Sequence, residues 1–126
     1  MVRLEAARKA ARTAIESTYE GVCTVIEYGD TTDEKTKITR QGEVIKIENQ
    51  PCKLSFEKLA AAVGTDTAAE ITQGVRLFIA PETPIQAGSK IVVTQNGVTT
   101  AYSASGEPAV YFSHMEIRLE LFRGWA

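Results

Sequence analysis

An Asn96-Gly97 pair between two runs of β-branched residues constrains the fold of this chain more than any other feature. A type I′ turn needs positive φ at both central positions, and the Asn-Gly pair tolerates this backbone. The pair therefore predicts a tight antiparallel hairpin whose register follows from the turn. We expect three facing pairs along it, namely Gln95 with Val98, Val93 with Thr100 and Ile91 with Tyr102.

The end of the chain alternates between apolar and polar side chains over residues 114–121. A period of two predicts a strand with one buried face and one solvated face. Together with the hairpin, this strand predicts an antiparallel β-barrel or closed sandwich of roughly five to seven strands. The core residues expected from the last strand are Met115, Ile117, Leu119 and Leu121.

Three earlier segments are also rich in β-branched and apolar residues, which is typical of strands. Pro51 lies in the second segment and cannot donate a ladder hydrogen bond, so it marks an edge, a bulge or a bend. A polar loop is expected at 29–37, and a short linker follows Tyr102. The three expected strands cover residues 21–28, 43–54 and 74–80.

An N-terminal α-helix is expected before the barrel, because residues 2–18 contain neither Gly nor Pro and are rich in helix-forming residues. Its apolar stripe consists largely of alanine, so it can bury little area on its own barrel. The helix is either solvated or docks onto a neighbouring subunit. Its opposite face is basic and carries Arg3, Arg8, Lys9 and Arg12.

Residues 55–74 form a long insertion between two expected strands that a short hairpin could join. Ser55 can cap a helix over residues 56–63, and Thr67 with Glu70 can form a capping box for a further helical turn. The insertion is therefore expected to be partly helical. Inserted segments of this length are usually functional or disordered.

Composition and motif content argue against an enzyme. The 126 residues suit a single domain, and a net charge of −2 does not suit a protein that grips nucleic acid mainly by charge. The sequence shows no long apolar run and no signal peptide, so we expect cytoplasmic synthesis and no membrane partner. Phosphate-binding loops, zinc-protease motifs and nucleophile–histidine pairs are not found in it either.

The cysteines and the histidine give no indication of a metal site. Cys23 and Cys52 match no ligand spacing, and we expect two reduced, buried thiols unless neighbouring strands allow a disulfide. His114 falls on the polar face of the last strand without a second ligand at suitable spacing. We therefore expect no catalytic, cofactor-binding or metal-binding residues.

The aromatic residues near the end of the chain are candidates for packing rather than for base stacking. Phe112, Phe122 and Trp125 could stack nucleobases in an OB-like barrel, but they lack interleaved basic residues. A Trp one residue from the chain end carries an association risk if it stays exposed. We expect a neighbouring subunit to cover Phe122 and Trp125, with packing onto their own barrel as the alternative.

A series of short motifs follows one another in a recognisable order between residues 20 and 126. These are residues 50–55, 75–81, 88–91, the Asn96-Gly97 hairpin, 113–117 and the Leu-Phe-Arg-Gly-Trp end. In this order they resemble minor capsid proteins of tailed bacteriophages and of prophages of Gram-positive bacteria. Those proteins are similar to the head-completion, or stopper, proteins of siphophage necks.

The resemblance implies a β-barrel that assembles with its own copies into a ring in the neck of the virion, after synthesis in the bacterial cytoplasm. The ring would close the DNA-filled head below the portal and adaptor rings and would receive the tail terminator or tail tube. The insertion at 55–74 would project into the channel and block double-stranded DNA without sequence specificity. The candidate blocking residues are Phe56, Lys58, Asp66, Thr67 and Glu70.

The shortest members of the family that the chain resembles do not have the N-terminal helix. We expect its basic face to meet acidic groups on a neighbouring ring.

Two alternatives remain for the chain as a whole. One is another neck ring, either an adaptor, which should be mainly helical, or a tail terminator. The other is an OB-like module for nucleic acid or a ligand, which would bind single strands in a salt-sensitive manner.

Overall fold

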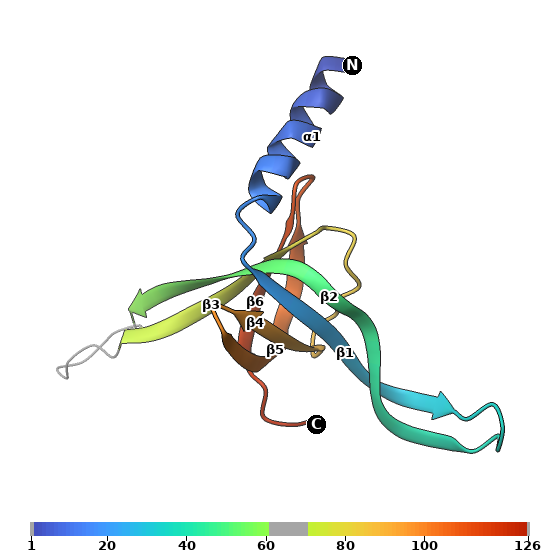
Figure 1. The fold of residues 1–126 in the computed structure, drawn as a ribbon. Helices are drawn as coiled ribbons and strands as arrows, with labels where there is room; N and C mark the ends of the chain where they lie inside the picture. The colour runs from blue at the N-terminus through green and yellow to red at the C-terminus, as the bar shows by residue number, and fades with distance from the viewer. Residues whose placement is uncertain (1, 61–70, 126) are drawn as a thin grey trace.

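The computed structural model describes residues 2–60 and 71–125. One helix, α1 (Val2–Glu16), precedes strands that close into an antiparallel barrel in the order β1-β2-β3-β6-β5-β4 (Figure 1). The expected mainly-β barrel with an N-terminal helix is therefore confirmed. The strands are β1 (Gly21–Thr32), β2 (Thr39–Ala60), β3 (Ile71–Ile79), β4 (Lys90–Gln95), β5 (Val98–Val110) and β6 (Met115–Leu121).

The β4–β5 hairpin has the register expected from its turn. Asn96 and Gly97 adopt φ values of 52° and 77°, as a type I′ turn requires. The structure pairs Gln95 with Val98, Val93 with Thr100 and Ile91 with Tyr102. β4 also pairs with β1, so this hairpin closes the barrel.

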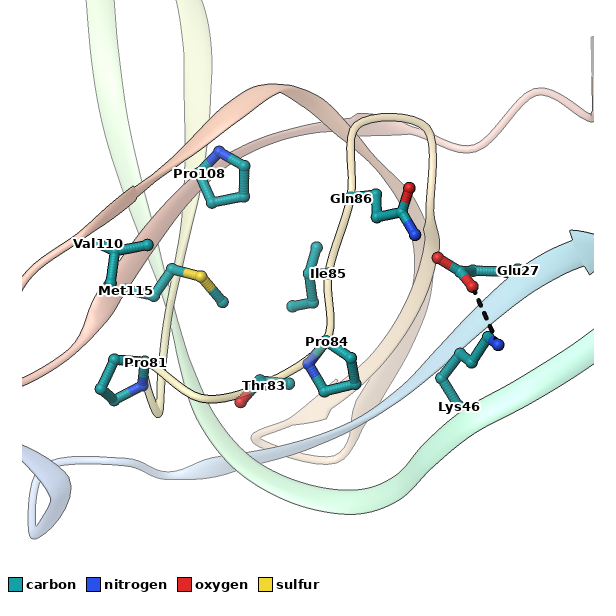
Figure 2. A pocket seen from close by; sticks show the side chains of 10 residues that line it. All are labelled: Glu27, Lys46, Pro81, Thr83, Pro84, Ile85, Gln86, Pro108, Val110 and Met115. Atoms are coloured by element: carbon teal, nitrogen blue, oxygen red, sulfur yellow. Dashed lines mark ion pairs between the residues drawn. The ribbon is translucent and has the colours of Figure 1, made fainter.

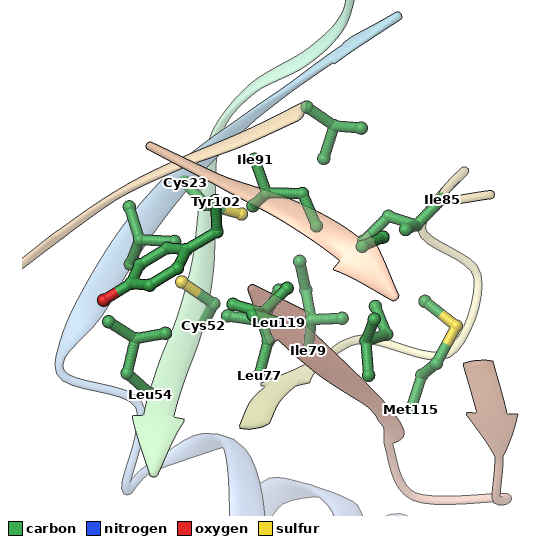
Figure 3. Close-up of a cluster of buried hydrophobic side chains, with 14 residues drawn as sticks. Cys23, Cys52, Leu54, Leu77, Ile79, Ile85, Ile91, Tyr102, Met115 and Leu119 are labelled. Carbon is green, nitrogen blue, oxygen red and sulfur yellow. The ribbon is translucent and has the colours of Figure 1, made fainter. Parts of the chain in front are cut away.

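The core fills the barrel with aliphatic side chains from all six strands (Figure 3). Of the four β6 residues expected there, Met115, Ile117 and Leu119 are buried, but Leu121 is 60% exposed, so that part of the prediction was wrong. The pairing of β6 with β3 stops at Leu119, whereas Leu121 pairs with Tyr102 of β5 on the other side of the strand. Its side chain therefore lies at the rim of the barrel.

The helix expected over residues 56–63 is wrong for the described part of that segment. β2 continues through Phe56 to Ala60 and pairs with β3 as far as Ile71. This pairing satisfies the backbone groups that a helix would otherwise have satisfied, and it overrides the local capping signal of Ser55. The remainder of the expected helix and the capping box lie outside the described residues.

The β1–β2 and β5–β6 hairpins, like the β2–β3 hairpin, are longer than expected. β1 and β2 pair up to Thr32 and Thr39, where a loop had been predicted from residue 29. β5 continues to Val110 through the stretch predicted as a linker. The β1–β2 and β2–β3 hairpins extend beyond the barrel in different directions, and we call them the β1–β2 arm and the β2–β3 arm (Figure 1).

Pro51 lies where β2 changes partners. It pairs with Val22 of β1, and the next residue along, Cys52, is the first to pair with β3. Asn49, two residues before it, adopts φ 52°, so the chain also bends here. The expected irregularity thus separates the part of β2 in one arm from the part in the other.

Candidate assembly surfaces

The β2–β3 arm carries the described residues that were expected to block a channel. Phe56 is 51% exposed, and the carboxylate of Glu57 lies 3.8 Å from the guanidinium of Arg76 on the neighbouring strand. Lys58 belongs to the paired part of β2. Asp66, Thr67 and Glu70 lie outside the described residues.

The four basic residues of α1 differ in their contacts. Arg12 pairs with Glu16 on its own helix and with Glu82 in the loop between β3 and β4. The hydrogen bond to Glu82, followed by that to Glu16, raises the pKa of Arg12, and the same contact lowers the pKa of Glu82. Arg12 therefore ties the base of the helix to its own barrel.

The remaining basic residues of α1 lie further from the barrel. The Arg8 guanidinium lies 5.4 Å from the centre of the Phe112 ring, at the tip of the β5–β6 hairpin. This distance suits a cation–π contact. Ile15, near the base of α1, is half-buried and shares a small hollow with Phe78 and His114 of the barrel. Arg3 and Lys9 are exposed, and the first part of α1 points away from the barrel (Figure 1).

The tip of the β5–β6 hairpin is an exposed apolar segment that the sequence did not reveal. Val110, Tyr111 and Phe112 are 64%, 49% and 57% exposed. Their hairpin is fixed to the barrel by His114, whose ring stacks on Tyr111 at 5.0 Å and lies 5.6 Å from Phe78. Phe112 was expected to pack in the core or at an interface, and its place at a hairpin tip was not predicted because the length of the β5–β6 hairpin was not apparent.

The C-terminal aromatic residues pack on their own barrel. Trp125 lies 5.4 Å from the ring of Tyr28 in β1 and 5.2 Å from that of Phe122. Its indole Nε1 donates to the Glu43 carboxylate of β2 at 3.1 Å, and Lys90 Nζ donates to the same carboxylate at 2.8 Å. We call these five residues the C-terminal clasp. Both Phe122 and Trp125 keep part of their surface exposed.

The structure does not bring Phe112 together with the other two aromatic residues. Phe112 contacts α1, whereas Phe122 and Trp125 lie at the base of the β1–β2 arm. In Figure 1 the C-terminus is on the side of the barrel away from α1. These residues therefore form no shared stacking platform of the kind expected for an OB-like nucleic-acid site.

An open groove of about 430 Å³ lies between the loop that follows β3 and the β5–β6 hairpin (Figure 2). One rim carries Glu27 and Lys46, whose charged atoms are 3.4 Å apart. The floor and the opposite rim are mostly apolar and rich in proline. They consist of Pro81, Pro84, Ile85, Pro108, Val110 and Met115.

The described part of the chain contains no group of three or more His, Cys, Asp or Glu side chains placed to hold a metal ion. Cys23 and Cys52 are buried free thiols on neighbouring strands, in diagonal rather than directly facing positions. The contact with Cys52, followed by burial, raises the pKa of Cys23 and keeps that thiol protonated. Among residues 2–60 and 71–125, no helix is long and apolar enough to span a membrane.

Comparisons with known proteins give a likeness of fold. No protein-family model matches the sequence, and no curated protein matches it. Among solved structures, the chain is similar to the phage-like element PBSX protein xkdH from Bacillus subtilis, with a TM-score of 0.50 and 8% sequence identity. The match covers 82% of this chain and 96% of that one. At this identity the likeness shows a shared barrel fold.

Proposed function

We propose that this protein is a structural component of a phage-type virion, namely a head-completion ring that stops DNA from leaving the filled head. The observation that carries the proposal is the β2–β3 arm, which extends past the barrel wall with Phe56 exposed on it. The motif order of the sequence and the fold likeness to a protein of a phage-like element both support this role.

In this proposal the barrel is the ring-forming body and the β2–β3 arm is the part that reaches the channel. An acidic chain suits a conduit for DNA, because a strongly basic lumen would hold the passing duplex. The role requires neither catalysis nor a cofactor. The strand-rich barrel also favours a stopper over an adaptor, which would be mainly helical.

The proposed partners are further copies of the chain in the same ring, the portal–adaptor assembly on the head side and the tail terminator or tail tube below. Duplex DNA would meet the ring in the channel without sequence-specific contacts. The candidate contact residues include the exposed Arg3 and Lys9 of α1 and the half-buried Phe122 and Trp125 of the clasp.

A shortened β2–β3 arm tests the blocking role. Glu57 and Gly74 face each other across β2 and β3, so joining them through an Asn-Gly turn removes residues 58–73 and keeps the register. We expect this variant to fold and to enter particles, but the filled heads should lose DNA. The measurement is the amount of nuclease-protected DNA per particle.

The matched control shortens the β1–β2 arm in the same way. Asp30 and Gln41 also face each other, and an Asn-Gly turn between them removes residues 31–40. Heads carrying the control should retain their DNA. If heads with the shortened β2–β3 arm retain DNA as well as the wild type does, the proposed blocking role is wrong.

A further inference from the structure

α1 is an amphipathic helix whose apolar side has little cover from its own barrel. Leu4 is 54% exposed and Ala7 is also exposed. Contacts to the rest of the chain come from Ile15 and Arg12 at the base and from Arg8 further up. A helix of 15 residues is marginal in water without tertiary packing, so the apolar side of α1 needs a surface to pack against.

Charge distinguishes the helix from the rest of the molecule. α1 carries four basic and two acidic side chains, a net charge of +2. Because the whole chain has a net charge of −2, the remainder carries −4. The helix of one copy is therefore complementary in charge to the barrel of another copy. These charges favour a second copy of this chain as the partner of α1.

The groove of Figure 2 has an apolar floor and a nearby acidic residue, which match the apolar and basic side chains of α1. Its floor is apolar, with Ile85 and Met115 at 8% and 3% exposure, while Val110 on its rim is 64% exposed. Glu107 is exposed directly beside the lining residue Pro108. No salt bridge to Glu107 is found among the described residues, so its carboxylate is available to a basic partner.

We propose that α1 of one copy packs across the groove of the next copy, with Leu4 against the apolar floor and the neighbouring Arg3, exposed at the edge of the apolar stripe, facing Glu107. This inference rests on the proposed ring function and assigns the contact between neighbouring subunits. Helix and groove are different surfaces of the same chain, so the contact is heterologous and repeats from copy to copy, as a ring requires. Arg12, held by Glu82 of its own chain, sets the direction in which the helix leaves its barrel.

Site-directed cross-linking of the full-length chain tests this contact. One sample carries Leu4→Cys and the other Val110→Cys, and the two are mixed at high concentration with a short bis-maleimide. Cys23 and Cys52 are 2% and 0% exposed and should not react. Because each chain has a single accessible thiol, a mixed cross-linked dimer can arise only between copies.

The matched control replaces Val110→Cys with Val98→Cys, at an equally exposed position, 63% against 64%, beside the β4–β5 turn. We expect the Leu4–Val110 pair to give about tenfold more mixed dimer than the Leu4–Val98 pair. Equal yields from the two pairs would overturn the proposed contact.

A charge exchange separates this contact from non-specific association. Adding Arg3→Glu to the Leu4→Cys chain should lower the yield about fivefold, and adding Glu107→Lys to the Val110→Cys chain should restore it. Failure of the second change to restore the yield overturns the pairing of Arg3 with Glu107. Neither outcome affects the DNA-retention test of the shortened β2–β3 arm, so failure of this contact and failure of the proposed function are distinguishable.

Discussion

Leu119 and Leu121 lie on the same face of β6, two residues apart, yet their exposed fractions are 4% and 60%. The alternation of the sequence shows which side of a strand is apolar, and for Met115, Ile117 and Leu119 it predicted burial correctly. It does not show how far the pairing with a neighbouring strand continues. That limit depends on the register of β3, which is set by contacts distant in sequence.

Substitution of the two leucines should therefore have unequal effects. Leu119→Ala removes a buried side chain and should lower the free energy of unfolding by about 2–5 kcal/mol. Leu121→Ala, the control on the same face of the same strand, should change it by no more than about 0.5 kcal/mol. Urea denaturation followed by circular dichroism measures both values. Equal losses would show that the end of β6 is buried in solution.

At the scale of elements, the β4–β5 hairpin was the part most fully determined by local chemistry. Positive φ at Asn96 and Gly97 selects one turn type, and that turn fixes every pair that follows. β2 was harder to predict, because its last residues pair with a strand whose position the local sequence does not specify. Ser55 and the residues after it can begin a helix in isolation, but pairing with β3 decides the outcome.

Glycine substitutions test the role of the turn. Gly97 has φ 77°, where a side chain is unfavourable, so Gly97→Ala should destabilise the chain by about 1–2 kcal/mol. Gly42 lies in β2 with nothing within 4 Å of an added Cβ and without a positive φ. Gly42→Ala should therefore leave stability unchanged or raise it by about 0.4–1 kcal/mol. Thermal unfolding of the two variants gives the comparison, and a neutral Gly97→Ala would contradict this account of the turn.

At the scale of the whole molecule, the C-terminal clasp joins the chain end to the base of the β1–β2 arm. The hydrogen bond from Lys90, followed by that from Trp125, lowers the pKa of Glu43 below its ordinary range. A carboxyl group with a depressed folded pKa stabilises the fold above its unfolded pKa, and this contribution is lost as the pH falls through the folded pKa. The clasp should therefore loosen in acid.

Fluorescence follows this loosening directly, because Trp125 is the single tryptophan of the chain. Emission from a dilute sample at neutral pH should be blue-shifted relative to free tryptophan. It should shift to the red when the pH falls below the ordinary range of a glutamate. Glu43→Gln removes the titrating group, so its emission should not change over that interval. A wild-type emission that is independent of pH would mean that Glu43 does not hold the indole.

The assembly surfaces were only partly predictable from the sequence. Basic residues on one face of α1 and aromatic residues near the chain end could be identified from composition and spacing. Their intramolecular contacts could not, because Glu82 and Glu43 approach Arg12 and Trp125 only after the barrel has closed. The exposed hairpin tip at Val110–Phe112 could not be predicted either, because it depends on how far β5 and β6 continue to pair.

β2 is a single strand of 22 residues, about 70 Å long at the usual rise per residue. It belongs to the β1–β2 arm at one end, to the barrel wall in the middle and to the β2–β3 arm at the other end. The two arms are therefore the two ends of one strand, and they are separated by the bend near Pro51. Because no loop separates the two arms along β2, we expect a displacement of one arm to change the orientation of the other.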